Sequence, residues 1–325
     1  MIQSTSTQNA CGRYRDLCSA SPDIPLFQQA WWLDATCGPD GWGVSLSLSD
    51  DKIVGALPFA DTRRLGFRIL TQPALTQFLG PWVAPTPAKT AERLSREKDI
   101  MGELIDQLPP HAHFSQAWST GVTNWLPFYW AGFRQTTRYT YAIDNLTDEE
   151  AIWSKFQTKI RGDIRKAEAR NGIHLREDPA LDDFIAVNDK TFARQGKLPP
   201  YSKAYLNKID QACLTRGQRK IFLAQDADGR VHAGAYLVWD SKRAYYLAGG
   251  GDPELRNSGA TSYCLWQAIR FAATVSTTFD FEGSMMEPVE RFFRGFGAEL
   301  TPYFYLTRTP SRLLRLRGAI QALIS

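Results

Sequence analysis

One pattern constrains the fold of this sequence most strongly: a β-favouring run, a polar turn and a second β-favouring run, and it occurs twice. Residues 43–60 carry it around the turn 49–52, and residues 220–239 carry it around the turn 226–229. Short β-rich runs joined by Asp, Ser and Gly residues are typical of β-hairpins. We therefore predict one hairpin in each half of the chain.

Both halves also predict the same order of elements, namely helix, hairpin, strand, helix and strand. Helices are expected at Leu26–Gly38 and Thr90–Leu108, and a new helix starts after Asp144–Thr147. Further strands are predicted at Arg68–Thr71, Thr76–Val83, Phe114–Trp118, Gln135–Ile143 and Arg243–Gly249. We expect an α/β (α+β) fold with two tandem domains, 1–145 and 146–325, each a mixed, mostly antiparallel sheet flanked by helices. Two unrelated α/β domains are the alternative.

Composition excludes several classes of protein. A net charge of +4 permits tRNA or a phosphorylated donor as partner but lacks the dense basic patch of a DNA-binding protein, so no DNA partner is expected. Five cysteines without a CxxC pair and four scattered histidines predict no metal site and a cytoplasmic protein. No apolar run reaches the roughly 18 residues of a membrane span.

A helix predicted at Asp148–Asn171 carries the first candidate site. Its apolar residues recur on one face, and cationic residues follow both flanks of that face. We expect Lys159, Arg161 and Arg165 to contact a phosphate-bearing donor, because guanidinium and ammonium groups bind phosphate. A solvated helix whose cations pair with nearby acids is the alternative.

The second candidate is the turn Arg256–Thr261, which joins a Gly-rich strand end to a helix. Backbone N–H groups in such a turn and the dipole of the following helix favour a bound anion. Arg256 and Gly259 are therefore predicted donor-binding residues. A plain strand–loop–helix connection is the alternative.

The third candidate is the strand predicted at Thr278–Ser284. Alternation places Asp280 and Glu282 on the face opposite its phenylalanines. One of these carboxylates is expected to bind an amine and accept its proton, and the other to pair with Arg291 or Arg294. Tyr303, on a later predicted strand, is the candidate acid toward a leaving group, although a structural tyrosine is the commoner case.

Several short motifs together resemble the FemABX-like branch of the GNAT superfamily, the peptidoglycan bridge aminoacyltransferases and related bacterial acyltransferases. The motifs are Phe27-Gln28-Gln29-Ala30-x-Trp32, Ala56-Leu57-Pro58, Phe78-Leu79-Gly80-Pro81, Lys159-x-Arg161-x-x-Ile164-Arg165-Lys166-Ala167, Thr191-Phe192-x-Arg194-Gln195-Gly196, Phe279-Asp280-Phe281-Glu282-Gly283-Ser284 and Phe292-Phe293-x-x-Phe296-Gly297. They span roughly residues 26 to 308.

The resemblance implies two tandem GNAT-like domains that move an aminoacyl or acyl group to an amine without a metal or a tightly bound cofactor. The donor substrate is expected to be aminoacyl-tRNA or acyl-CoA. In the superfamily, an R/Q-x-x-G-x-G/A turn binds the coenzyme A pyrophosphate. Arg256 and Gly259 match its first and fourth positions, and Thr261 replaces its last residue.

The sequence departs from the family at two cationic positions. The transferases that act on cell-wall precursors carry Lys where Thr36 stands, and Arg-Gly-Pro where this chain has Leu79-Gly80-Pro81. Both differences remove positive charge that a nucleotide-sugar pyrophosphate would need. They argue against that acceptor.

The leading functional hypothesis is an amide-forming acyltransferase that uses aminoacyl-tRNA. An N-acyltransferase that uses acyl-CoA or an acyl carrier protein, without tRNA, is the second, and a non-catalytic binding protein on the same fold is the third. The acceptor is expected to be a small-molecule or peptide amine. The basic amphipathic helix predicted at Ser311–Ile324 either packs back on the first domain or contacts a membrane surface.

Overall fold

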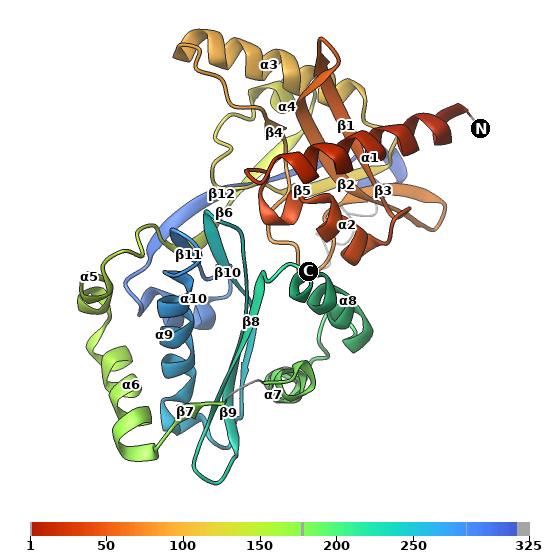
Figure 1. Ribbon diagram of the computed structural model, residues 1–325. Coiled ribbons are helices and arrows are strands. Elements are labelled where there is room, and N and C mark those ends of the chain that lie inside the picture. The colour runs from red at the N-terminus through yellow and green to blue at the C-terminus, as the bar shows by residue number, and fades with distance from the viewer. Residues whose placement is uncertain (1, 177–178, 284, 317–325) are drawn as a thin grey trace. The chain divides into compact units, whose positions relative to one another are not determined.

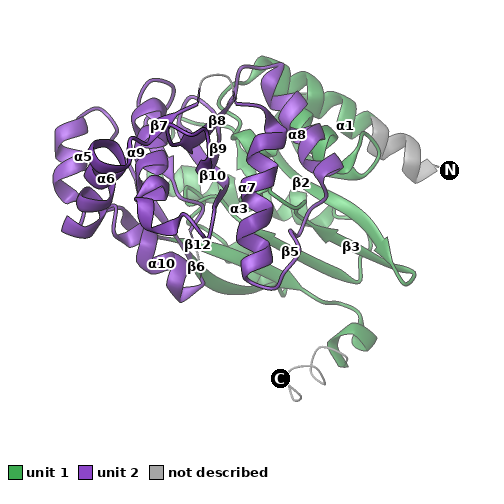
Figure 2. Ribbon diagram, turned by 90° about the horizontal axis from the view of Figure 1, so that it is seen from below, with its two compact units in different colours: residues 1–138, 302–325 green, residues 139–301 purple. Residues whose placement is uncertain are grey.

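The computed structural model of the chain describes residues 2–176, 179–283 and 285–316. Its contacts define two compact units, residues 1–138 with 302–325 and residues 139–301 (Figure 2). Each unit is built on a mixed sheet of mostly antiparallel strands flanked by helices, as the sequence predicts. The domain limits predicted from the sequence, 1–145 and 146–325, stay a prediction.

Unit 1 has a sheet in the order β1-β2-β3-β5-β12, with β4 paired to β2. Its strands are β1 (Trp42–Ser49), β2 (Lys52–Arg64), β3 (Phe67–Thr71), β4 (Trp82–Val83), β5 (His113–Ala117) and the end of β12 (Glu299–Arg308). Its helices are α1 (Ile2–Ala20), the 3₁₀ turn η1 (Leu26–Gln28), α2 (Ala30–Cys37), α3 (Thr90–Asp106) and α4 (Leu126–Trp130). One buried cluster joins α1 and α2 to β1, and another joins α3 and α4 to β2, β3 and β5.

Unit 2 has a sheet in the order β6-β11-β10-β9-β8-β7. The strands are β6 (Arg134–Ile143), β7 (His174–Leu175), β8 (Arg219–Gln225), β9 (Val231–Trp239), β10 (Arg243–Gly251) and β11 (Thr278–Asp280). The helices are α5 (Glu149–Lys155), α6 (Thr158–Asn171), α7 (Leu181–Arg194), α8 (Lys203–Leu214), η2 (Arg256–Ser258), α9 (Ala260–Ala272) and α10 (Glu287–Arg294). Helices α5, α6 and α9 lie on one face of this sheet and α7 and α8 on the other (Figure 1).

Both predicted hairpins are confirmed, as β1–β2 and β8–β9. At the second turn, Gly229 adopts a φ of 77° and donates its N–H to the carbonyl of Asp226 at 3.0 Å. A side chain at that φ would be strained, so the glycine fixes the turn and with it the register of the two strands.

The sequence missed α1 and predicted too long a strand at Thr76–Val83. Cys11, Tyr14 and Cys18 of α1 are buried at helical spacing, but the many Ser, Thr and Gln residues around them conceal the pattern. Of the predicted strand only β4 forms. The chain turns at Gly80, where φ is 95° and a Cβ would lie 2.7 Å from the Trp118 ring.

The predicted helix Asp148–Asn171 is two helices, because the chain is extended at Phe156 and Gln157. The N–H of Gln157 donates instead to the carbonyl of Gly295 at 2.8 Å. The side chain of Asp148 caps α5 by accepting from the Ala151 N–H at 2.9 Å. Of the predicted helix Ser311–Ile324, residues 312–316 are helical and the rest lies outside the described residues.

Alanine substitutions at two glycines of unit 2 are predicted to change the free energy of unfolding in opposite directions. At Gly250 a new Cβ would lie 2.7 Å from the Asn188 Cα and the Val187 carbonyl oxygen, so Gly250→Ala must push α7 away from β10. It should lower the free energy of unfolding by about 1–3 kcal/mol. Gly162 is exposed inside α6 with nothing within 4 Å of a new Cβ, so Gly162→Ala should raise that free energy by about 0.5–1 kcal/mol.

Urea unfolding of both variants measures the difference. Equal effects of the two substitutions would contradict the close packing of α7 on β10.

Candidate functional site

Asp280 ends β11 and is fully buried, at 0% exposure, on the face opposite the buried rings of Phe279 and Phe281. Its Oδ2 accepts from the Arg243 guanidinium at 2.8 Å. Its Oδ1 accepts from the Thr140 hydroxyl at 2.5 Å and from the Glu282 backbone N–H at 2.8 Å. Burial raises the pKa of Asp280, and Arg243 opposes that rise.

The carboxylate of Asp280 therefore joins three adjacent strands, β6, β10 and β11. The ion-pair partner considered from the sequence was wrong: it is Arg243, while Arg294 pairs with Glu290. Arg243 was missed because it is far from Asp280 in the chain. The register that places it beside Asp280 comes from the parallel pairing of Tyr245 with Asp280, which no local pattern shows.

Glu282 does not continue the strand that the sequence predicted to Ser284. β11 ends at Asp280, Glu282 has a φ of 54°, and the backbone of Gly283 packs against Thr140, where a Cβ would lie 2.2 Å from its Cα. A non-glycine residue in the left-handed region costs of order 1–3 kcal/mol and often marks a functional site. The conformation carries Glu282 away from the ladder and into a separate environment.

The carboxyl group of Glu282 is poorly solvated. Its Oε1 is buried and has no hydrogen-bond donor within reach among the described residues. Burial, followed by the negative charge of Asp280, raises the pKa of Glu282 well above its ordinary value. A raised pKa strengthens the Glu282 carboxylate as a proton acceptor, which is what a general base requires.

Aromatic and amide groups that the sequence analysis missed lie around Glu282. Burial and then the charges of Asp189 and Glu282 raise the pKa of Tyr201 to about 12. The Tyr201 hydroxyl donates to Asn188 Oδ1 at 3.1 Å, and Asn188 Nδ2 donates to the Gly249 carbonyl at 2.8 Å. These residues come from α7, its following loop and β10, so only the fold brings them together.

β10 and β11 separate beside this group. They pair only over 243–245 and 278–280, and the register of β10 shifts between Tyr246 and Ala248. Beyond that point β11 has ended and β10 runs on to Gly251. The described residues thus leave the hydrogen-bonding edge of 247–251 without a strand on the β11 side, a place where an extended ligand can pair with the backbone.

The end of β10 leads into the predicted anion-binding turn. Residues 256–258 form η2, Gly259 is left-handed with φ 83°, and α9 follows. Thr261 lies close to Gly251, since a Cβ there would be 3.3 Å from its hydroxyl. The first N–H groups of α9 therefore lie at the end of the separated β10, with the positive end of the helix dipole.

Gly259 has a second role, in packing. A Cβ at this position would lie 2.1 Å from the carbonyl oxygen of Asp163, so only glycine lets α6 approach the turn. Lys166 donates to the Asn257 carbonyl at 2.5 Å, and Asn171 donates to the Ser258 carbonyl at 2.8 Å. One side of the turn is thus covered by α6, while Arg256 is exposed.

The predicted cations of α6 already make contacts within the protein. Lys159 pairs with Asp163 at 2.8 Å, Arg161 donates to the Ser154 carbonyl at 3.1 Å, and Arg165 lies 5.7 Å from the centre of the Trp153 ring. The Lys159 side chain is 80% exposed, so its pair is worth about 1 kcal/mol or less and a phosphate can displace it.

A hollow of about 370 Å³ lies beside the turn. Its lining includes Lys166, Asn257, Arg230 and His232. His232 is buried, contacts Asp226 Oδ2 through Nε2 at 3.0 Å, and has no described partner for Nδ1. The hydrogen bond with His232 holds the pKa of Asp226 well below its ordinary value. The sequence analysis missed this pair, whose members flank one hairpin turn.

Tyr303 lies in unit 1, on β12, whereas Asp280 and Glu282 lie in unit 2. It is buried and packs edge-on against Phe78, with ring centres 5.0 Å apart.

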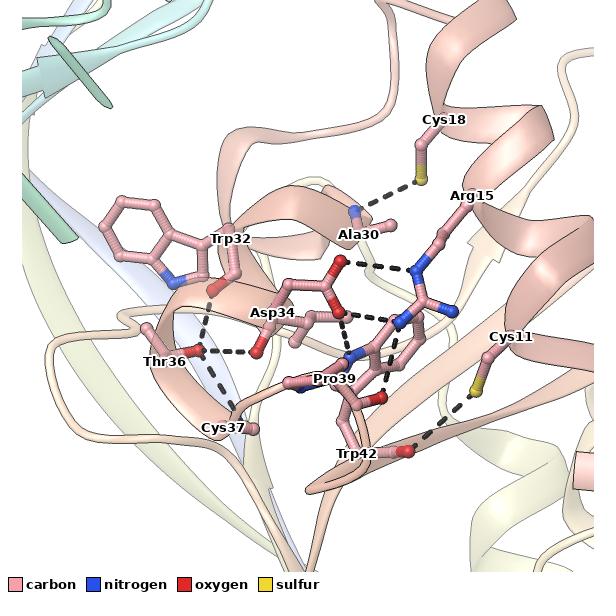
Figure 3. Close-up of polar contacts among 11 residues, drawn as sticks. Cys11, Arg15, Cys18, Ala30, Trp32, Asp34, Thr36, Cys37, Pro39 and Trp42 are labelled. Atoms are coloured by element: carbon pink, nitrogen blue, oxygen red, sulfur yellow. Dashed lines mark hydrogen bonds and ion pairs between the residues drawn. The ribbon is translucent and has the colours of Figure 1, made fainter. Parts of the chain in front are cut away.

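In the same unit, the hydroxyl of Thr36 donates to the Trp32 carbonyl at 2.7 Å (Figure 3). The residue at the family's lysine position thus bonds to its own helix and supplies no cation.

Among the described residues, no group of three His, Cys, Asp or Glu side chains is placed to hold a metal ion. None of the helices in the described part of the chain is long and apolar enough to cross a bilayer.

Residues 154–294 match the family model of the acetyltransferase (GNAT) domain. The matched segment lies within unit 2 and includes the separated strands and the helix N-terminus beside them. A comparison with curated proteins finds no match.

The fold of the whole chain is similar to that of FemX, at 14% identity and a TM-score of 0.65, covering 89% of this chain and 95% of FemX. It is also similar to a tandem GNAT protein from the clavulanic acid biosynthesis pathway, at 10% identity and a TM-score of 0.51, covering 92% and 94%. A C-terminal domain (DUF2156) from Agrobacterium fabrum, titled as that of a lysylphosphatidylglycerol synthetase, has 14% identity and a TM-score of 0.56, covering 95% and 97%. The predicted resemblance to the FemABX-like branch and the predicted fold class are confirmed.

Substitution of Asp280 tests its structural role. Asp280→Asn leaves the largely buried Arg243 guanidinium without a counter-charge, so the free energy of unfolding should fall by about 3–5 kcal/mol. The matched control is Lys159→Gln, which breaks an exposed pair and should change it by less than about 1 kcal/mol. Denaturant unfolding gives both values, and a mild effect of Asp280→Asn would show that the network does not stabilise unit 2.

Proposed function

We propose that this chain transfers an acyl or aminoacyl group from an activated donor to an amine and forms an amide. The observation that carries the proposal is the buried, unpartnered carboxyl oxygen of Glu282, within a GNAT domain. An amine attacks only when neutral, and a carboxylate can bind the ammonium form and take its proton. Asp280 is less suited to this role, because its oxygens already accept three hydrogen bonds.

The proposed reaction follows from these roles. The substrate ammonium gives a proton to the Glu282 carboxylate, and the amine nitrogen forms a bond to the donor carbonyl carbon. The bond from that carbon to the leaving oxygen or sulfur then breaks. After the attack the nitrogen still carries one proton too many for an amide. The leaving group takes up a proton, for which Tyr303 stays the candidate donor, and the surplus nitrogen proton restores the tyrosine. Positioning of the two substrates supplies much of the rate.

Aminoacyl-tRNA is the proposed donor, with acyl-CoA or an acyl carrier protein as the second candidate. The exposed cations of α6 and the hollow beside η2 support a phosphate-rich donor of either kind. The similarity to FemX supports aminoacyl transfer, and the similarity to the tandem GNAT protein, whose structure was solved without AcCoA, supports a thioester as the second candidate. A binding protein without turnover is the third candidate; the raised pKa of Glu282 favours the enzyme. The acceptor is proposed to be a small-molecule or peptide amine.

Glu282→Gln should lower the rate of amide formation by about 10²–10⁴-fold at neutral pH, because it removes the general base. In the wild-type protein the rate should rise with pH through the raised pKa of Glu282, since only the carboxylate accepts a proton. That limb of the pH–rate profile should disappear in the variant. Transfer of labelled amino acid from charged tRNA, and of labelled acetyl from acetyl-CoA, to a panel of amines measures both effects.

Glu287→Gln, which changes an exposed glutamate of α10, is the matched control and should keep the wild-type rate. A wild-type rate and an unchanged profile in Glu282→Gln would remove Glu282 from the mechanism. Failure of every donor to react would leave the binding protein as the function.

The cations of α6 are predicted to bind the donor. The double variant Arg161→Ala and Arg165→Ala should weaken binding of the donor about 5- to 25-fold, and binding by the wild-type protein should weaken as salt rises, because phosphate contacts release counterions. Fluorescence anisotropy with labelled tRNA and displacement by coenzyme A measure the two donor classes separately. Lys208→Ala, an exposed cation of α8 on the other face of unit 2, is the control. Equal effects of control and double variant would make α6 an ordinary solvated helix.

A further inference from the structure

One end of the unit 1 sheet joins three segments that are distant in sequence. The β2–β3 turn lies beside the start of β5, because Arg68 accepts the Ala112 N–H at 2.8 Å and Ile69 pairs with His113. β12 ends on the other side of β5, where Thr309 contacts His113 Nδ1 at 2.8 Å. Residues 63–68 and 308–311 thus lie on either side of 111–114, and the helical residues 312–316 follow directly in the chain. We call the three segments 63–68, 111–114 and 308–316 the basic end.

The charge of the basic end is of one sign. Its three segments contain six arginines, two histidines and no aspartate or glutamate. Arg68 pairs with Asp61, whereas Arg63, Arg64, Arg312 and Arg315 have no carboxylate partner in the part of the chain that the structure describes. Unpaired arginines at such density attract phosphate-bearing surfaces.

The basic end also carries exposed leucines among these arginines. Leu65 is 85% exposed at the tip of the β2–β3 turn, and Leu313 and Leu316 are 69% and 63% exposed on the helical turn after β12. Figure 2 shows that helical turn standing clear of the sheet of unit 1. Isolated leucines are common on surfaces, but here three of them occur on one basic surface.

Leu65 is also unfavourable for its own turn. Leu65 and Gly66 have φ angles of 49° and 81°, the left-handed pair of a tight hairpin turn. Asn or Asp is favoured at the first of these positions, and a leucine there costs conformational energy. An exposed leucine adds little buried apolar area to its own unit and here also occupies a strained backbone position. We therefore infer that Leu65 contacts a surface outside the unit.

We propose that the basic end docks on an anionic lipid surface, with the leucines entering the interface and the arginines binding lipid phosphates. The combination of exposed aliphatic side chains and unpaired arginines is that of an interfacial membrane contact. A nucleic acid would use the arginines but would gain nothing from the leucines. The proposal is independent of the transfer reaction.

Vesicle flotation tests the proposal directly. The full chain should float with vesicles of phosphatidylcholine that contain about one third phosphatidylglycerol, but not with phosphatidylcholine alone. Salt near 1 M should release it, because screening at that concentration is short-ranged. Arg63→Glu with Arg64→Glu should weaken partition at least about 25-fold, at roughly fivefold per arginine. Leu65→Ser should weaken it by about tenfold or more.

Matched controls lie in unit 2. Lys197→Glu with Lys208→Glu reverses two exposed charges, and Leu198→Ser removes a leucine that is 89% exposed. Both should float like the wild-type chain. Equal flotation on neutral and anionic vesicles, or equal loss in the controls, overturns the proposal. So does a double arginine variant that loses tRNA binding and keeps flotation, which would make the basic end a nucleic-acid site. The salt release of the wild-type chain stands as evidence even where a variant fails to fold.

Discussion

The arrangement of unit 2 depends on one fully buried carboxylate. Asp280 takes a guanidinium from β10, a hydroxyl from β6 and a backbone N–H from the residue two positions on. Each donor fixes one strand or turn relative to the others. Loss of any one donor would lower the free energy of unfolding, because water does not reach the buried carboxylate to replace it. The network therefore sets where β11 stops, and hence where Glu282 begins its left-handed turn. The buried carboxylate of Asp280 thus positions the carboxyl group of Glu282, which is the proposed general base.

The elements with a strong local pattern were predictable from the sequence. Both hairpins and most helices follow from period and turn residues, and alternation predicts Asp280 and Glu282 as candidate carboxylates without deciding between them. The contacts that the sequence did not predict join residues that are distant in the chain. Arg243 meets Asp280 only through a parallel register. Asn188, which bonds to Tyr201, meets Gly249 only because α7 packs on β10. The end of β11 was misplaced because alternation continues past Asp280, whereas Gly283 must pack on Thr140.

The glycines of unit 2 show how backbone proximity shapes both the packing and the candidate site. Gly250 admits α7 to one face of β10, and Gly259 admits α6 to the turn before α9. A motif glycine that sequence reasoning assigns to a ligand can thus serve a helix instead.

Unit 1 contains residues from both ends of the described chain, because residues 302–316 count with it and all of 139–301 lies between. Its strand β5 pairs with β12 along Tyr305–Arg308, and β12 is the last strand among the described residues. A nascent chain can complete unit 2 while unit 1 still has an open edge at β5. Open edges invite pairing with other chains, so synthesis itself imposes an order in which the first-made half is the last to be closed.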